Sequence, residues 1–121
     1  MNVSFDAPKP EIKIFYGKNS VPKDIVGQVT LGIEEEGLPF SVEEKESSDA
    51  LHLAYKAAEA SHLGVGIGIG ENVTLHFIKF KEDEPLFSIK SENNEENLRN
   101  MGANAARLVK RMPFKDVGEQ A

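Results

Sequence analysis

The stretch Leu63–Asn72, LGVGIGIGEN, is the first segment whose residue types could do chemistry, because loops that bind phosphate are rich in glycine. A phosphate loop, however, needs Lys and then Ser or Thr after its last glycine, and a dinucleotide fingerprint needs a helix there. In this chain another β-patterned run follows the glycines. Glycine inside a strand is typical of a backbone that another element approaches closely. We therefore predict a central strand packed against a helix, and no nucleotide site on this chain.

Histidines and paired acids offer no better catalytic pattern. His52, His62 and His76 show neither HxH nor HExxH spacing, and each lies far from any acid that would orient it as a general base. We interpret them as surface or partly buried histidines. Glu43 and Glu44 could act as acid and base only if they faced the same way, but adjacent residues of a strand point to opposite faces. A solvated sheet edge is the better interpretation of this pair.

Composition predicts one soluble domain. The chain has 121 residues, of which 40% are apolar and 28% are charged, and these values are typical of a single globular domain. It has no cysteine, and its N-terminus lacks a basic segment followed by an apolar run, so we expect a cytoplasmic protein. The net charge is −6 and the bases form no stripe, which argues against nucleic acid and membrane as partners. We expect a flexible N-terminus at residues 1–10, a single domain at residues 11–114 and a flexible tail at residues 115–121.

The elements that must position any site follow from hydrophobic periodicity and turn residues. We expect a strand at 11–17; a helix capped by Ser20, with Pro22 in its first turn, that ends at Gly37; a half-charged edge strand at 39–45; an alanine-rich helix within 47–64 with serines as possible caps; strands at 65–70, 72–80 and 85–91; and a helix at 94–111. This order predicts an α/β fold with three layers, α/β/α, around a mixed five-stranded sheet.

The last expected helix has one apolar face. Gly102 falls within this face and is predicted to allow close packing on the sheet. Asn104 and Arg107 are predicted to point outward, either as solvated polar residues or as contacts with a partner. Four residues at helical spacing form the face that docks on the sheet: Leu98, Met101, Ala105 and Leu108.

Three consecutive glutamates, Glu34–Glu36, stand at the expected end of the first helix, where the helix dipole favours Lys or Arg. A helical wheel at about 100° per residue places Glu36 close to the apolar stripe, whereas Glu34 and Glu35 leave that stripe on opposite sides. The three acids therefore do not share one role. The apolar stripe consists of Ile25, Val29 and Ile33.

The outward face of the same helix combines acids with an apolar side chain. Glu35 shares this face with Asp24, Gln28 and Leu31, and an exposed leucine beside acids is typical of a contact patch. A solvated acidic helix end is the alternative, because runs of charge usually face solvent.

Four blocks of the sequence resemble one known family. The segments VTLGIEEEGLPF (Val29–Phe40) and NMGANAARLVKRMPF (Asn100–Phe114) resemble signature blocks of the small subunit of the reactivating factor for coenzyme B12-dependent diol and glycerol dehydratases. Between them, HLGVGIGIGENVTLHF (His62–Phe77) is similar to the glycine-rich strand of that family, and EPLFSIK (Glu84–Lys90) to its next strand. The resemblance runs in the family's order from about Ile12 to Phe114.

The resemblance implies a chaperone component without catalytic residues of its own. Members pair with a large subunit that carries an actin-like ATPase domain, where ATP and ADP bind, in a complex of two large and two small subunits. That complex releases damaged cobalamin from an inactivated dehydratase. Because the small subunit is similar in fold to the dehydratase's medium subunit, the resemblance also implies subunit exchange. Whether the protein works free in the cytoplasm or in a bacterial microcompartment stays open.

The resemblance assigns one metal ligand. In the family, the second glutamate of the Gly-x-Glu-Glu motif, here Glu35, reaches across to the large subunit and ligates Mg2+ near the nucleotide. The expected interface therefore comprises Asp24, Gln28, Leu31, Glu34 and Glu35, with Asn104 and Arg107 as further contacts.

Two other functions stay open. The chain could be the dehydratase's medium subunit or a fragment of it, or an independent small-molecule-binding module whose pocket lies at the carboxyl ends of the strands.

Overall fold

The computed structural model describes residues 9–18 and 23–121. The predicted cap Ser20 and the first-turn residue Pro22 lie outside these ranges, as does most of the N-terminal segment expected to be flexible. No helix within the described ranges is long and apolar enough to span a membrane. The elements are β1 (Ile12–Gly17), α1 (Lys23–Glu35), β2 (Phe40–Lys45), α2 (Ala50–Ala60), β3 (Val65–Ile69), β4 (Asn72–Phe77), β5 (Phe87–Lys90) and α3 (Glu95–Lys110).

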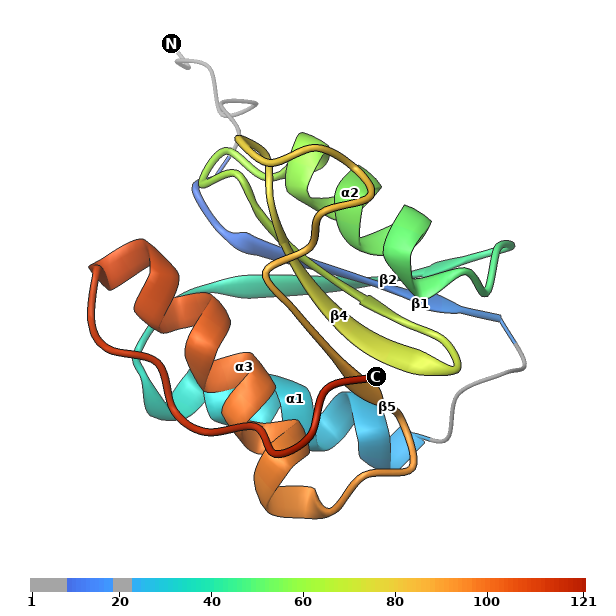
Figure 1. The fold of residues 1–121 in the computed structure, drawn as a ribbon. Helices are drawn as coiled ribbons and strands as arrows, with labels where there is room; N and C mark the ends of the chain where they lie inside the picture. The colour runs from blue at the N-terminus through green and yellow to red at the C-terminus, as the bar shows by residue number, and fades with distance from the viewer. Residues whose placement is uncertain (1–8, 19–22) are drawn as a thin grey trace, which may run out of the picture.

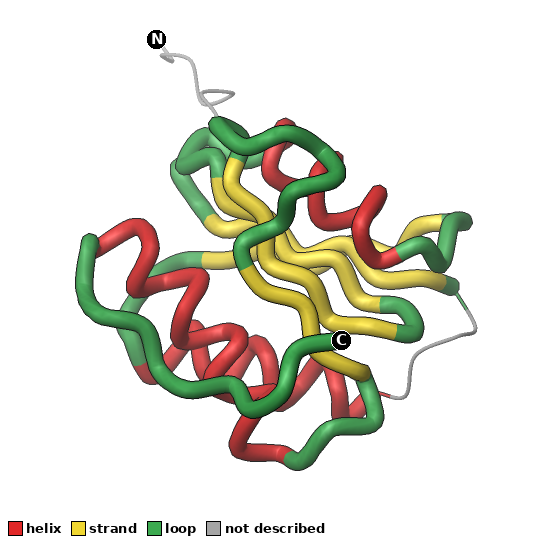
Figure 2. Tube along the Cα trace, viewed as in Figure 1, coloured by secondary structure: helices red, strands yellow, loops and turns green. Residues whose placement is uncertain are grey.

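The strands form one mixed sheet in the spatial order β2-β1-β3-β4-β5 (Figures 1 and 2). β1 runs parallel to β2 and β3, whereas β4 runs antiparallel to β3 and β5. α2 covers one face of the sheet, and α1 and α3 lie side by side on the other. The prediction of three layers around a mixed five-stranded sheet, with β2 at its edge, is confirmed.

The glycines of β3 let α2 approach the centre of the sheet. A Cβ atom at Gly66 or Gly68 would collide with the backbone of α2 near Ala54. The alternate residues Ile67 and Ile69 are fully buried and belong to the main core. The glycine run is therefore a helix-packing surface, as its sequence predicts.

Two further glycines bring α1 and α3 into contact. A Cβ atom at Gly32 would collide with the backbone carbonyl of Arg99, and one at Gly102 with that of Val29. Our prediction that Gly102 packs on the sheet is therefore wrong, because it packs against α1. The residues predicted to dock α3 do contact the core, three of them buried and the last half-buried: Leu98, Met101, Ala105 and Leu108.

Side-chain caps fix where the helices begin. Asp49 caps α2 by accepting a hydrogen bond from the backbone N–H of His52 (3.4 Å). We had expected a serine in this position, but Ser47 Oγ instead accepts a hydrogen bond from the N–H of Asp49 (3.1 Å). Asn94 caps α3 by accepting the N–H of Asn97 (2.8 Å).

The C-terminal residues differ from the flexible tail that we expected. Residues 115–121 run along α3 and end beside β5 (Figure 1). Val117 is buried with 3% of its surface exposed, and the backbone N–H of Ala121 donates to the carbonyl of Ser88 (2.8 Å). The polar composition of this segment favours a flexible tail, but its single valine, Val117, is buried in the core and holds the segment in place.

Candidate partner interface on helix α1

Helix α1 presents one continuous outward stripe. Positions 24, 28, 31 and 35 recur at helical spacing within the uninterrupted helix, so they lie on the same side of it. Asp24 and Glu35 are exposed, and Leu31 keeps 37% of its surface exposed. The opposite side is buried, and it consists of Ile25, Val29 and Ile33.

Gln28 marks the border of this stripe with α3. Its Oε1 accepts hydrogen bonds from Nε and Nη2 of Arg99, at 3.3 and 3.1 Å. Gln28 is half-buried as a result. The stripe is therefore continuous with the surface of α3 on this side.

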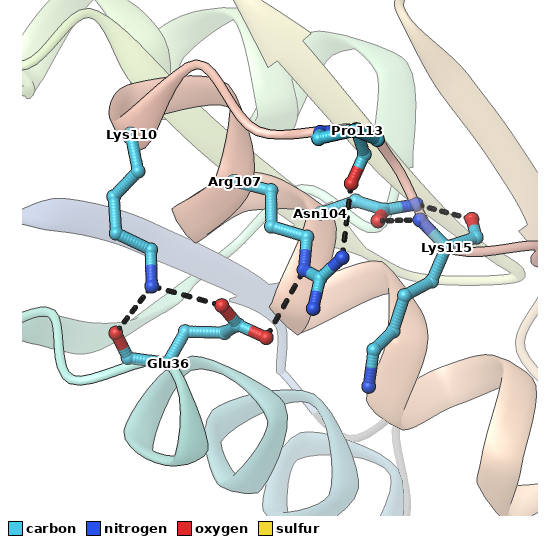
Figure 3. Close-up of polar contacts among 6 residues, drawn as sticks. All are labelled: Glu36, Asn104, Arg107, Lys110, Pro113 and Lys115. Atoms are coloured by element: carbon cyan, nitrogen blue, oxygen red, sulfur yellow. Dashed lines mark hydrogen bonds and ion pairs between the residues drawn. The ribbon is translucent and has the colours of Figure 1, made fainter.

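Glu36 is held by two cations of α3 (Figure 3). Its carboxylate accepts from Arg107 Nε (3.1 Å) and Lys110 Nζ (2.9 Å), and only 11% of its side chain is exposed. Hydrogen bonding to Lys110, followed by that to Arg107, holds the pKa of the Glu36 carboxyl below its usual range, although burial opposes the shift. The inward position that the helical wheel predicts for Glu36 is confirmed.

Lys110 also interacts favourably with the negative end of the α1 dipole. Its Nζ donates to the backbone carbonyl of Glu36 (2.8 Å), immediately after the last residue of the helix. A cation therefore stands where the helix dipole favours one, although it comes from another helix. The sequence signal for this contact is the pair of long basic residues, Arg107 and Lys110, in the last turn of α3.

Unlike Glu36, Glu34 and Glu35 have no cationic partner among the described residues to offset their unfavourable position at the end of the helix. Both are exposed, and their carboxylates make no ion pair with the residues that the structure describes. An unpaired carboxylate at a helix C-terminus is slightly unfavourable for the isolated chain. It is also free to bind a cation or a basic side chain of another molecule.

No complete metal site is formed by this surface. Across residues 9–18 and 23–121, no group of three or more His, Cys, Asp or Glu side chains could hold a metal ion. A divalent cation bound at Glu35 would need most of its oxygen ligands from elsewhere.

A hollow of about 690 Å³ adjoins the N-terminal end of the stripe. It lies at the carboxyl end of β3, and Asp24 and Gln28 form part of its wall. Glu71, Glu92 and Glu95 also line it, opposed by the single base Lys90. The hollow therefore extends the acidic surface of α1 toward the end of the sheet.

Of the two further contacts predicted on α3, neither is a free surface residue. Asn104 is fully buried, so the prediction that it points outward is wrong. Its side-chain amide donates to the carbonyl of Lys115 (2.9 Å) and its Oδ1 accepts the N–H of the same residue (2.7 Å). Arg107 keeps 22% of its side chain exposed and donates to Glu36 and to the carbonyl of Pro113 (Figure 3).

The histidines form no catalytic group. His62 is exposed, and His76 is fully buried, with Nε2 3.0 Å from the carbonyl oxygen of Glu82. His52 Nδ1 lies 3.1 Å from Glu82 Oε2, so our statement that every histidine is far from an acid is wrong for His52. The acid is 30 residues away in sequence, and the fold of the β4–β5 loop brings it close. Both side chains are about half exposed, so this pair is a surface contact.

Comparisons with known proteins agree on one family. The family model described as dehydratase medium subunit matches residues 9–115. The propanediol dehydratase-reactivating factor small subunit of Citrobacter freundii is 44% identical over 94 residues, which are 77% of this chain and 81% of that protein. The diol dehydratase-reactivating factor small subunit of Klebsiella michiganensis is 34% identical over 122 residues, which are 100% of this chain and 94% of that protein.

Two solved structures have the same fold. A structure of diol dehydratase-reactivating factor complexed with ADP and Mg2+ contains a chain with a TM-score of 0.82 and 34% identity, covering 90% of this chain and 100% of that one. A glycerol dehydratase reactivase chain gives a TM-score of 0.85 at 28% identity, covering 91% of this chain and 100% of that one.

Proposed function

This chain belongs to the dehydratase medium subunit family, among its reactivating-factor small subunits, and from that premise we propose that it helps to reactivate a B12-dependent diol or glycerol dehydratase. In this role it assembles with an ATPase large subunit, two copies of each, and the complex releases damaged cobalamin from the inactivated enzyme. The observation that carries the proposal is the 34% identity to a reactivating-factor small subunit along the whole chain.

The division of labour assigns ATP hydrolysis to the large subunit. The glycine-rich stretch of this chain packs against α2, whose backbone occupies the space beside Gly66 and Gly68. The small subunit contributes binding surfaces to the complex. We propose that it acts in the cytoplasm or in a microcompartment within the cytoplasm.

The α1 stripe is the proposed contact with the large subunit. Glu35 is exposed and unpaired in the described part of the chain, whereas its neighbour Glu36 is occupied by Arg107 and Lys110. Mg2+ prefers carboxylate oxygens and usually keeps only one or two protein carboxylates, so one free glutamate suits a shared site. When bound, the ion would link Glu35 to the nucleotide-binding subunit and offset the unfavourable acid at the helix end.

Subunit exchange fits a fold that two complexes have in common. The family model for the dehydratase medium subunit covers residues 9–115, while the similar curated proteins are reactivating-factor subunits. A chain that shares its fold with a dehydratase subunit can compete for that subunit's place. Displacement of the medium subunit would open the cobalamin site and let the damaged cofactor leave.

Co-purification tests the proposal directly. The tagged chain is expected to recover the ATPase large subunit, and the pair is expected to restore activity to a cobalamin-inactivated dehydratase when ATP and Mg2+ are present. Omission of this chain is the control and should abolish reactivation. Recovery with the cobalamin-binding catalytic subunit alone would instead identify a dehydratase medium subunit, and recovery with neither would favour a small-molecule-binding module that uses the hollow beside β3.

A further inference from the structure

The last turn of α1 is held mainly by the residues around Glu35. Helix ends open readily, because the last carbonyls of a helix lack partners within it. Here the N–H of Glu36 donates to the carbonyl of Ile33 (3.1 Å), and the N–H of Gly37 donates to that of Glu34 (3.0 Å). Glu35 itself is exposed and makes no ion pair in the described part of the chain. Its position therefore depends on how its neighbours are held.

Glu36 binds α3 through three hydrogen bonds. Lys110 Nζ donates to the carboxylate of Glu36 (2.9 Å) and to its backbone carbonyl (2.8 Å), and Arg107 Nε donates to the carboxylate (3.1 Å). We call Glu36, Arg107 and Lys110 the clamp. Arg107 is itself held, since its Nη1 donates to the carbonyl of Pro113 (3.0 Å; Figure 3). The clamp thus holds both the side chain and the backbone of the residue that follows Glu35.

The side chain of Glu35 does not take part in the clamp. Successive residues of a helix differ in direction by about 100°. Only 11% of the Glu36 side chain is exposed, whereas Glu35 is exposed to solvent. The clamp can therefore fix the backbone at the end of α1 and leave the carboxylate of Glu35 free for a partner.

We propose that Arg107 and Lys110 are positioning residues for Glu35: by binding Glu36, they hold the end of α1 in the geometry that presents the Glu35 carboxylate to the large subunit. This inference rests on the proposed function, because it takes the α1 stripe as the contact with that subunit. A contact that is held in place before binding avoids the entropy cost of ordering it on binding. Without the clamp, assembly would have to meet that cost.

Positioning and simple charge effects predict opposite results for Lys110. Its Nζ is a cation at an acidic helix end that is proposed to attract a cation or a basic side chain. By charge alone, removal of Lys110 would make this helix end more negative and strengthen assembly with such a partner. If Lys110 acts by positioning Glu35, the same removal weakens assembly. The sign of the change in affinity therefore distinguishes the two effects.

Lys110→Met removes the charge and both donated hydrogen bonds. We expect it to weaken binding of the large subunit by roughly 2- to 10-fold in calorimetric titrations with Mg2+ present. Lys110→Arg should retain the affinity, since a guanidinium can donate to the same two oxygens. Lys56→Met is the matched control: it removes the same charge from an exposed ion pair with Glu59 on α2 and should change nothing. In a chain that already carries Glu35→Ala, Lys110→Met should have no further effect on affinity.

Amide exchange in the free chain tests the clamp without any partner. Lys110→Met should speed exchange at the amides of Glu36 and Gly37, which close the last turn of α1, whereas Lys56→Met should not. Unchanged exchange at these amides would overturn the proposal. An affinity of Lys110→Met equal to or above that of wild type would also overturn it, as would a loss that persists in full beside Glu35→Ala.

The single variant Glu35→Ala separates this inference from the proposed function. If Glu35→Ala weakens assembly but Lys110→Met does not, the contact through α1 stands and the positioning role is refuted. If Glu35→Ala alone binds like wild type, the proposed contact through α1 is itself refuted, and the positioning role fails with it.

Discussion

Adjacent residues Glu35 and Glu36 have opposite surroundings, and this contrast separates a structural acid from a binding acid. Glu36 is bound by two cations of α3, whereas Glu35 has no ion pair among the residues that the structure describes. Glu35 does not stabilise the fold and is slightly unfavourable next to the helix dipole. It is therefore a candidate for binding a partner.

Glu35→Ala is expected to leave the isolated chain folded, with stability unchanged or raised by about 0.3–1 kcal/mol. The same change should weaken assembly with the large subunit by on the order of 2–5 kcal/mol when Mg2+ is present, because a charged contact buried on binding is lost. Glu34→Ala is the matched control and should do much less. Titration of both variants with and without Mg2+ measures the effect, and wild-type affinities throughout would leave Glu35 a solvated surface acid.

Glu36 gives the chain an acid-sensitive contact between α1 and α3. Its pKa is lowered in the folded chain, so its contribution is complete above the ordinary value of 4.5 and is lost as pH falls through the folded value. Glu36→Gln is therefore expected to reduce stability above that pH by about 1.5–3 kcal/mol and to flatten the acid-induced decrease. Thermal melts of wild type, Glu36→Gln and the exposed control Glu34→Gln at several pH values would measure this, and parallel profiles for all three would contradict it.

At the scale of elements, most of the fold follows from periodicity, but the contacts between elements do not. Hydrophobic periodicity and turn residues predict the order and kind of the elements from β1 to α3, and the glycines of β3 predict a closely packed helix. The partner of Gly102 could not be predicted, because a small residue on an apolar face can pack equally well on a sheet or on another helix. The same limit hides the pairing of Glu36 with Arg107 and Lys110, which are more than 70 residues away.

The C-terminal segment illustrates a second limit of sequence reasoning. Residues 115–121 are mostly polar, which favours disorder, and one apolar residue gives little periodic signal. Two contacts order them: Val117 is buried in the core, and Asn104 makes two hydrogen bonds with the backbone of Lys115. Asn104 was predicted to point outward from α3. Residue type alone predicts that a polar side chain is exposed to solvent. That prediction fails when a backbone segment from elsewhere in the chain covers the side chain.

Gly102→Ala tests the contact between α1 and α3. The added Cβ would collide with the carbonyl of Val29, so the helices must separate, at a cost of about 1–3 kcal/mol. Gly27→Ala is the matched control, since its Cβ would meet nothing within 4 Å and alanine favours helix by up to about 1 kcal/mol. Urea denaturation should therefore move the two midpoints in opposite directions, and a shift of the same sign for both would place the helices farther apart than the structure does.

At the scale of the whole molecule, a subunit that exchanges between complexes needs an interface that can also be released. The α1 stripe offers one exposed apolar residue, Leu31, among acids, and the molecule as a whole carries a net charge of −6. Large apolar interfaces favour permanent complexes, whereas charged ones favour fast and salt-sensitive association. The stripe is therefore suited to a partner that binds and leaves.

Salt dependence provides the corresponding prediction. The affinity for the large subunit is expected to fall as ionic strength rises at constant Mg2+, because screening weakens attraction between exposed charges. Asp24→Asn should lower the affinity by about 1 kcal/mol or less and make the salt dependence less steep, since one of the interacting charges is removed. Leu31→Ala should weaken binding equally at all salt concentrations, because the loss of apolar contact area is insensitive to screening. Calorimetric titration of the three proteins in increasing sodium chloride distinguishes these slopes, and a wild-type affinity that does not change with salt would mean that the acids of α1 lie outside the interface.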